Sequence, residues 1–107
     1  MHVARRIKTW NRSRNCGAVV GATYPEELRK IRSILGEDVP LLIPGIGKQG
    51  GDLEKTIMYG TNTQAGMALI NSSRGIIYAS SDYNFAESAG DAAATLQKQI
   101  NHLRTRK

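Results

Sequence analysis

The chain has 107 residues, of which 40% are hydrophobic and 22% charged, and its formal net charge is +6. This length fits one domain spanning residues 1–107, and the composition excludes an intrinsically disordered chain. No apolar run approaches the ~20 residues that cross a bilayer, and no apolar segment follows the basic N-terminus, so neither a membrane protein nor a secreted one is expected.

The positive charge is concentrated at the two ends of the sequence. Residues 1–16 carry five cations and no acid, residues 98–107 carry four cations and no acid, and residues 17–97 carry 6 basic against 9 acidic residues. Charged ends of this kind are usually solvated helix faces, and aromatic-rich basic signatures are absent, so nucleic acid is not the expected partner. The single cysteine, Cys16, cannot form an internal disulfide, which favours a reducing, cytoplasmic location.

Residues 2–12 predict a helix, because Val3, Ile7 and Trp10 recur at the spacing of one amphipathic face. The cations of this segment then occupy its outer face. Residues 17–22 form a short apolar run of small residues, which is typical of a buried strand with both faces covered.

The next helix is predicted to begin at Thr23. Thr23 and Glu26 have the spacing of a capping box, and Pro25 suits a first helical turn because its missing N–H has no partner there. The buried stripe of this helix is expected to contain Leu28, Ile31 and Leu35. Gly36 is expected to end it.

Residues 39–43 predict a second strand and residues 67–71 a third. Between them, Asp52 is expected to cap a helix. The buried residues of that helix are expected to be Leu53, Ile57 and Met58. The third strand ends at the polar residues 72–75, and residues 76–78 are expected to form a short apolar turn.

The last helix is predicted to begin near Ser81 or Asp82. Its apolar stripe is expected to bury Phe85, Ala89, Ala92, Leu96, Ile100 and Leu103. A leading helix within residues 1–14, followed by three β/α units within residues 17–104, predicts an α/β fold with parallel strands. In such folds ligands bind beyond the carboxyl ends of the strands.

Two segments that follow strands are candidate anion sites. Four glycines lie within residues 45–51, ahead of a helix N-terminus, and this pattern lets backbone N–H groups approach an anion. The alternative is a tight turn that binds nothing. After the next strand, Arg74 offers a fork of donors suited to phosphate oxygens, beside the N–H groups of Ser73 and Gly75. Its alternative is an ordinary surface arginine.

Three segments together resemble the orotidine 5′-phosphate decarboxylases. They are LIPGIGKQGGD at 42–52, INSSRGIIYA at 70–79 and VGATYPEEL at 20–28. The resemblance extends over residues 15–104 and implies a partial TIM (β/α)8 barrel with about three parallel strands, the last three β/α units of the family's barrel. It implies conversion of orotidine 5′-monophosphate (OMP) to uridine 5′-monophosphate (UMP) and carbon dioxide in pyrimidine biosynthesis, without metal or organic cofactor.

The resemblance also implies roles for particular residues. Arg74 binds the substrate 5′-phosphate together with backbone groups around Ser73 and Gly75. Gln49 and Gly50 belong to the glycine-rich loop, and Gln49 bridges the phosphate and pyrimidine regions. The pocket near the pyrimidine is lined by Pro44 and Ile46. Lys48 departs from the small residue expected before the glutamine and is expected to point to solvent.

A larger departure is that the family's catalytic Asp-x-Lys-x-x-Asp array is absent from these 107 residues. Asp52 and Lys55 have a different spacing. No catalytic residue is therefore assigned, and the isolated chain is expected to be inactive. His2, His102 and Cys16 show no metal-ligand spacing, so no metal is expected.

Two functional hypotheses remain from the sequence. The chain is either the phosphate-binding part of a decarboxylase or a non-catalytic phosphate-binding or nucleotide-binding module, a gene remnant being one form of the latter. Three parallel strands leave unpaired edges and exposed apolar faces. A homo-oligomer or a complementing N-terminal barrel segment is therefore expected to cover them.

Overall fold

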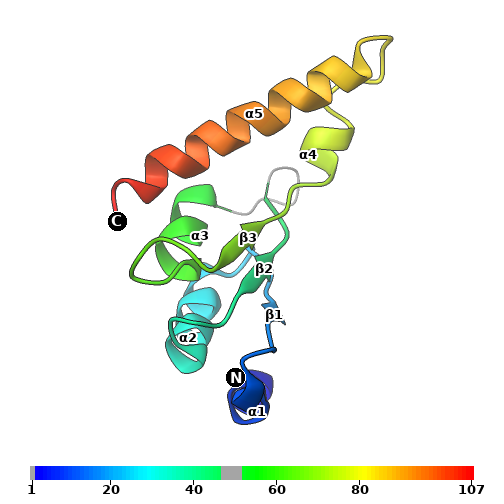
Figure 1. Ribbon diagram of the computed structural model, residues 1–107. Coiled ribbons are helices and arrows are strands. Elements are labelled where there is room, and N and C mark those ends of the chain that lie inside the picture. The colour runs from blue at the N-terminus through cyan, green and yellow to red at the C-terminus, as the bar shows by residue number, and fades with distance from the viewer. Residues whose placement is uncertain (1, 47–51) are drawn as a thin grey trace.

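The computed structural model describes residues 2–46 and 52–107, in which helices alternate with three short strands (Figure 1). The alternation predicted from the sequence is confirmed. The elements in chain order are α1 (His2–Trp10), the 3-10 turn η1 (Asn11–Ser13), β1 (Ala18–Val19), α2 (Pro25–Leu35), β2 (Leu41–Ile43), α3 (Leu53–Gly60), β3 (Ala68–Ile70), α4 (Arg74–Ile77) and α5 (Phe85–Arg104).

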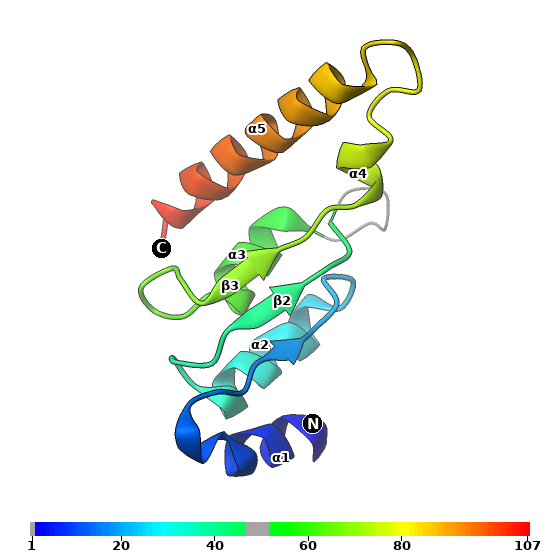
Figure 2. The same cartoon turned by 45° about the vertical axis from the view of Figure 1, so that its right-hand side comes forward.

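The strands form one parallel sheet in the order β1-β2-β3. Helices α2 and α3 lie against one face of this sheet, α1 lies beyond the β1 edge, and α5 lies beyond the β3 edge (Figure 2). Within residues 2–46 and 52–107 no further strand pairs with either edge, so the sheet is open. Because neighbouring strands are parallel, their carboxyl ends point to the same edge of the molecule.

The two faces of the sheet differ in exposure. Leu41 and Ile43 are fully buried on the face that α2 and α3 cover. Leu42 points the other way and is in register with Val19 and Leu69. These three side chains are 40%, 70% and 64% exposed, respectively. An apolar ladder across three strands is therefore uncovered in the structure.

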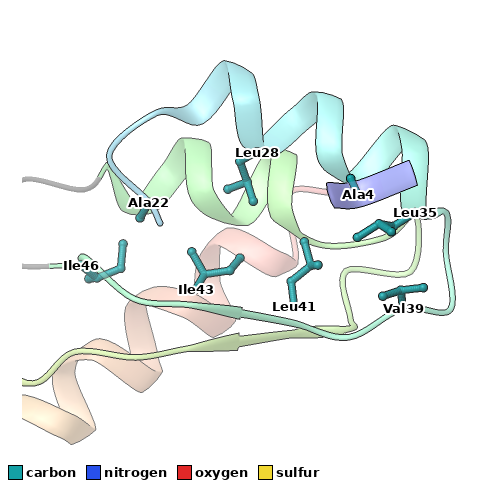
Figure 3. Close-up of a cluster of buried hydrophobic side chains, with 8 residues drawn as sticks. All are labelled: Ala4, Ala22, Leu28, Leu35, Val39, Leu41, Ile43 and Ile46. Atoms are coloured by element: carbon teal, nitrogen blue, oxygen red, sulfur yellow. The ribbon is translucent and has the colours of Figure 1, made fainter. Parts of the chain in front are cut away.

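The hydrophobic core lies between the sheet and the helices (Figure 3). Its buried members are Ala4, Ala22, Leu28, Leu35, Val39, Leu41, Ile43 and Ile46. Gly60 permits the close approach of α3, because a Cβ atom there would lie 2.6 Å from Ile43 Cδ1. A larger residue would push the helix away from β2.

Of the two helix N-caps predicted from the sequence, one forms and the other does not. Asp52 caps α3 as predicted, its side chain accepting a hydrogen bond of 3.0 Å from the Lys55 N–H. The capping box expected at Thr23 does not form. Tyr24 occupies the N-cap of α2 without a side-chain cap, and Pro25 takes the first helical position as predicted.

Some residues predicted to be buried are exposed. Met58 is exposed on α3, where the buried neighbour of Ile57 is Thr56. In α2, Ile31 is only half-buried and Arg32 is buried in its place. The exposed apolar residues of α1 are Val3 and Trp10, at 66% and 63%. Helix α1 contacts only α2 and η1 strongly, so its apolar face is covered on one side only.

The C-terminal region also differs from expectation. Residues 72–78, predicted as a loop and an apolar turn, contain the short helix α4. Helix α5 begins at Phe85, later than predicted, and Phe85 is exposed. The rest of its predicted stripe is half-buried, at Ala89, Ala92, Leu96, Ile100 and Leu103. No helix in the described part of the chain is long and apolar enough to cross a membrane.

Candidate functional site

Hydrogen bonds join the loops that follow the three strands. The Ala22 N–H after β1 donates to the Pro44 carbonyl after β2 over 2.9 Å. The Ser72 hydroxyl after β3 donates to the Ile46 carbonyl over 3.3 Å. Five of the residues singled out from the sequence, Pro44, Ile46, Ser73, Arg74 and Gly75, therefore lie at one edge of the sheet.

The first of these loops turns sharply after β2. Gly45 has a φ of +102°, in the left-handed region that favours glycine, and it is buried. Pro44 is half-buried, whereas Ile46 is 7% exposed and packs into the hydrophobic core (Figure 3). The turn thus anchors the start of the glycine-rich segment to the core. Lys48, Gln49 and Gly50 fall outside the described residues.

The second loop presents backbone donors beside a cation. The N–H groups of Ser73, Arg74 and Gly75 donate to no acceptor within the described residues. The first backbone hydrogen bond of α4 runs from the Ile76 N–H to the Ser73 carbonyl. The Arg74 side chain is exposed and forms no ion pair in that part of the chain. Three consecutive N–H groups with no acceptor in the described ranges, next to a guanidinium, suit an oxyanion such as phosphate.

Two contacts shape this second loop. The Asn71 side-chain amide donates to the Ser73 hydroxyl over 3.2 Å. A Cβ atom at Gly75 would lie 3.0 Å from Ser72 Oγ, the hydroxyl that bonds to Ile46. A side chain at Gly75 would therefore press on the link between the two loops.

A cavity of about 410 Å³ lies behind these loops, between them and α5. Its lining residues are Ile46, Leu53, Ser72, Gly75, Ile76, Ala92, Thr95, Leu96 and Gln99. None of them is charged, and Arg74 is not among them. The cavity brings Ile46 of the first loop and Gly75 of the second loop to one place.

Sequence reasoning missed a polar cluster at the opposite end of the strands, centred on Arg32. This side chain is 7% exposed and donates to the carbonyls of Gly36, Val39, Gly60 and Met67 over 2.6–2.9 Å. Burial lowers the pKa of Arg32 from its ordinary value, and Glu37 acts in the opposite direction. The signal was present in the sequence, since Leu28, Arg32 and Leu35 share one helical face.

Two further charged groups belong to this cluster. Hydrogen bonds from the hydroxyl and N–H of Thr63 lower the pKa of Glu37. Lys107 Nζ donates to the Met58 and Thr61 carbonyls and to the Thr61 hydroxyl, and desolvation lowers its pKa. Every shifted pKa in the described residues therefore lies at the amino end of the sheet, where the groups hold the fold together.

Comparison with known proteins places this geometry in a family. Residues 1–89 match the model of the orotidine 5′-phosphate decarboxylase / HUMPS family. The chain is 52% identical over 103 residues to an orotidine 5′-phosphate decarboxylase of Ralstonia nicotianae, and the match covers 95% of this chain and 38% of the relative. It is 47% identical over 106 residues to the Bordetella pertussis enzyme, with coverage of 98% and 39%.

A solved structure shows the same fold. The UMP synthase of Leishmania donovani superposes with a TM-score of 0.78 at 35% identity, over 96% of this chain and 22% of that one. The chain thus spans less than two-fifths of the curated relatives it matches, 38% and 39% of their lengths. Its three parallel strands and their helices form part of a (β/α)8 barrel, and the chain belongs to the orotidine 5′-phosphate decarboxylase / HUMPS family.

Proposed function

We propose that the chain provides the phosphate-binding part of an orotidine 5′-phosphate decarboxylase site in pyrimidine biosynthesis. The ligand is a nucleoside monophosphate, OMP or UMP, whose 5′-phosphate binds Arg74 and the N–H groups of Ser73 and Gly75. The observation that carries this proposal is that three consecutive N–H groups beside the Arg74 side chain, at the carboxyl end of β3, donate to no acceptor among the described residues. Pro44, Ile46, Gln49 and Gly50 complete the ligand site in this proposal.

Binding and chemistry are separate contributions in this proposal. Loss of carbon dioxide leaves an electron pair on the pyrimidine carbon, which a lysine stabilises and then protonates, while a carboxylate destabilises the bound substrate. The acid–lysine array of the family is absent from these 107 residues. We therefore propose that this chain binds the 5′-phosphate, and we expect the catalytic groups to come from residues outside this sequence.

The open face of the sheet supports a complementing partner. The ladder of Val19, Leu42 and Leu69 borders a shallow groove of about 300 Å³. Interiors of (β/α)8 barrels are filled by such branched side chains from neighbouring strands. The remaining β/α units of a barrel fit this face, whether they belong to the same polypeptide or to another. Such units also bring the missing acid–lysine array, which a second copy of this chain lacks.

UMP binding tests the phosphate site. UMP at about 100 times its dissociation constant is expected to stabilise the chain by about 2.7 kcal/mol, measured as a higher melting temperature. Arg74→Ala is expected to abolish the shift, and Lys98→Ala, which removes an equal charge from the exposed face of α5, is expected to preserve it. An unchanged shift in Arg74→Ala would remove this arginine from the site.

The alternative function is a nucleotide-binding module without catalysis, which the missing acid–lysine array favours. A decarboxylation assay separates the two. We expect no turnover from the chain alone and measurable turnover after mixing with the N-terminal barrel units of the Ralstonia nicotianae relative. A UMP-induced shift without turnover in the mixture would favour the binding module.

A further inference from the structure

A second candidate site lies between α1 and α2, on the side of the sheet opposite α4 and α5 (Figures 1 and 2). It is a groove of about 520 Å³, which we call the cation groove. Its lining residues are Arg5, Arg29, Lys30, Ser33 and Ile34. Three of these five side chains are cations, and none is an acid. This position separates the groove from Arg74 by the width of the sheet.

The cations of the groove are available to a ligand. Arg5 and Lys30 are exposed, and neither side chain forms an ion pair or hydrogen bond with another described residue. Arg29 pairs with Glu26 over 3.5 Å, but both side chains are more than 60% exposed, and such pairs are weak in water. The guanidinium of Arg29 also lies 5.8 Å from the Tyr59 ring centroid, which helps to position it.

The field around the groove extends along α1 and η1. Arg6, Lys8, Arg12 and Arg14 are all exposed, and residues 2–16 contain no acid. Glu26 and Glu27, in the first turn of α2, are the nearest acids in sequence to Arg29 and Lys30. The cations therefore outnumber the acids in residues 2–16 and α2, the segments that supply the groove. A ligand with several closely spaced negative charges matches this surface better than a single anion does.

We propose that the cation groove binds a chain of phosphate groups, either an inorganic polyphosphate or the backbone of a single-stranded nucleic acid. Each repeat of such a chain carries one negative charge, so a short segment meets all three cations of the groove. The arginine forks of Arg5 and Arg29 bind phosphate oxygens in pairs, and Lys30 adds a point charge. The Ser33 hydroxyl, which makes no hydrogen bond to a described residue, adds a neutral donor.

This inference revises the expectation that the basic N-terminal segment is only a solvated helix face. The sequence places cations on two separate helices, and the fold brings Arg5 of α1 beside Arg29 and Lys30 of α2. The inference is independent of the proposed function, because it uses no residue of the Arg74 loop. A failure of either proposal leaves the other unaffected.

Titration of a fluorescently labelled oligothymidylate, in competition with inorganic polyphosphate, tests the proposal. The parent chain is compared with the double variant Arg5→Ala/Lys30→Ala. The matched control is Lys55→Ala/Lys98→Ala, which removes the same charge from exposed positions of α3 and α5. Melting curves check that each variant is folded.

We expect the groove variant to bind roughly tenfold more weakly than the parent and the control to bind within about twofold of it. The slope of log affinity against log salt should fall in magnitude by about 1.4 in the groove variant, since each phosphate contact on a single strand contributes about 0.7. Displacement of the oligothymidylate by polyphosphate shows one shared site for phosphate chains. Tighter binding of the oligothymidylate assigns the site to the nucleic-acid backbone, and binding of polyphosphate without binding of oligothymidylate assigns it to the free polymer.

Three results would overturn the proposal. An equal loss in the control variant would mean attraction by net charge only. Loss of binding in Arg74→Ala would place the polyanion at the nucleotide loop instead. Oligoglutamate binding as tightly as polyphosphate, with the same response to Arg5→Ala/Lys30→Ala, would show a site for acidic peptides and not for phosphate.

Discussion

The guanidinium of Arg32 holds the carbonyl oxygen of Gly60 with two nitrogens, Nε at 2.9 Å and Nη2 at 2.6 Å. The same side chain reaches the carbonyls of Val39 and Met67, just before β2 and β3. One residue of α2 thus ties together the end of α3 and the starts of two strands. The Met67 carbonyl also accepts the Leu41 N–H over 3.0 Å. None of these carbonyls has another side-chain donor among the described residues.

Replacement of Arg32 is therefore expected to destabilise the fold strongly. Arg32→Leu leaves the buried carbonyls of Val39 and Gly60 without their side-chain donor, at about 1–3 kcal/mol each, so we expect a loss of about 3 kcal/mol or more in the free energy of unfolding. Urea denaturation measures it. Arg32→Lys should recover only part of the loss because an ammonium lacks the planar fork. Lys30→Leu, exposed on the same helix, should change stability by less than about 0.5 kcal/mol.

The contact between Gly60 and Ile43 predicts a coupled pair of substitutions. Gly60→Ala places a methyl group 2.6 Å from Ile43 Cδ1, and overpacking of this kind costs about 1–3 kcal/mol. Ile43→Val removes that Cδ1 atom and alone costs about 1 kcal/mol. The double variant should be more stable than the sum of the single effects predicts, as measured by a double-mutant cycle. Strict additivity would show that α3 shifts freely.

Gly75 predicts a link between loop shape and ligand binding. Gly75→Ala brings a Cβ atom to 3.0 Å from Ser72 Oγ and should reduce the UMP-induced rise in melting temperature. Gly90→Ala is the matched control, because nothing lies within 4 Å of its Cβ position in α5. That substitution should stabilise the chain by about 1 kcal/mol and leave the UMP response intact. An unaltered response in Gly75→Ala would contradict the loop geometry.

The lowered pKa of Glu37 predicts a loss of stability in acid. Thr63 hydrogen-bonds the carboxylate, so the folded state binds a proton less readily than the unfolded state does. The contribution is present above the ordinary value of 4.5 and is lost as the pH falls through the lower folded pKa. Glu37→Gln should therefore be less stable than the parent at neutral pH and approach it in strong acid. Glu87→Gln, at an exposed position of α5, is the matched control for the loss of one carboxylate.

The uncovered ladder predicts self-association of the isolated chain. Leu69 is 64% exposed on β3, at one end of the uncovered apolar ladder, and a charge there opposes burial against any partner. We expect Leu69→Lys to reduce the concentration dependence of light scattering and to weaken complementation by N-terminal barrel units. Scattering that is independent of concentration in the parent chain would contradict this prediction.

The sequence predicted the strands better than their assigned lengths suggest. Residues 17–22 were expected to form one strand, and β1 spans only Ala18–Val19. Yet the N–H groups of Ala18, Val20 and Ala22 donate in turn to the carbonyls of Pro40, Leu42 and Pro44. The parallel ladder therefore extends over the range that the continuous apolar run at residues 17–22 predicted.

The errors arose where burial depends on distant partners. An apolar periodicity assigns polar side chains to the exposed face, so it predicted that Ile31 and not Arg32 is buried. Arg32 is buried because its hydrogen-bond acceptors lie up to 35 residues away in the sequence, where periodicity carries no information. Periodicity also predicted burial along α5, where only part of the face meets α3 and α4. The candidate site residues Pro44, Ile46, Ser73, Arg74 and Gly75 were predicted from motifs, and their role in binding stays a prediction. Their shared edge follows from parallel strand order.

The Arg32 cluster has a consequence for how this sequence can change over evolutionary time. Its acceptors are backbone carbonyls, which every residue type provides. The hydrogen bonds of Arg32 therefore persist through most side-chain substitutions in the segments that they join. The loops that follow the carboxyl ends of the strands provide no acceptor for these Arg32 hydrogen bonds. Selection can therefore change the loops at one end of the sheet while the hydrogen bonds at the other end preserve the fold, which makes this chain a tolerant scaffold for new ligand specificities.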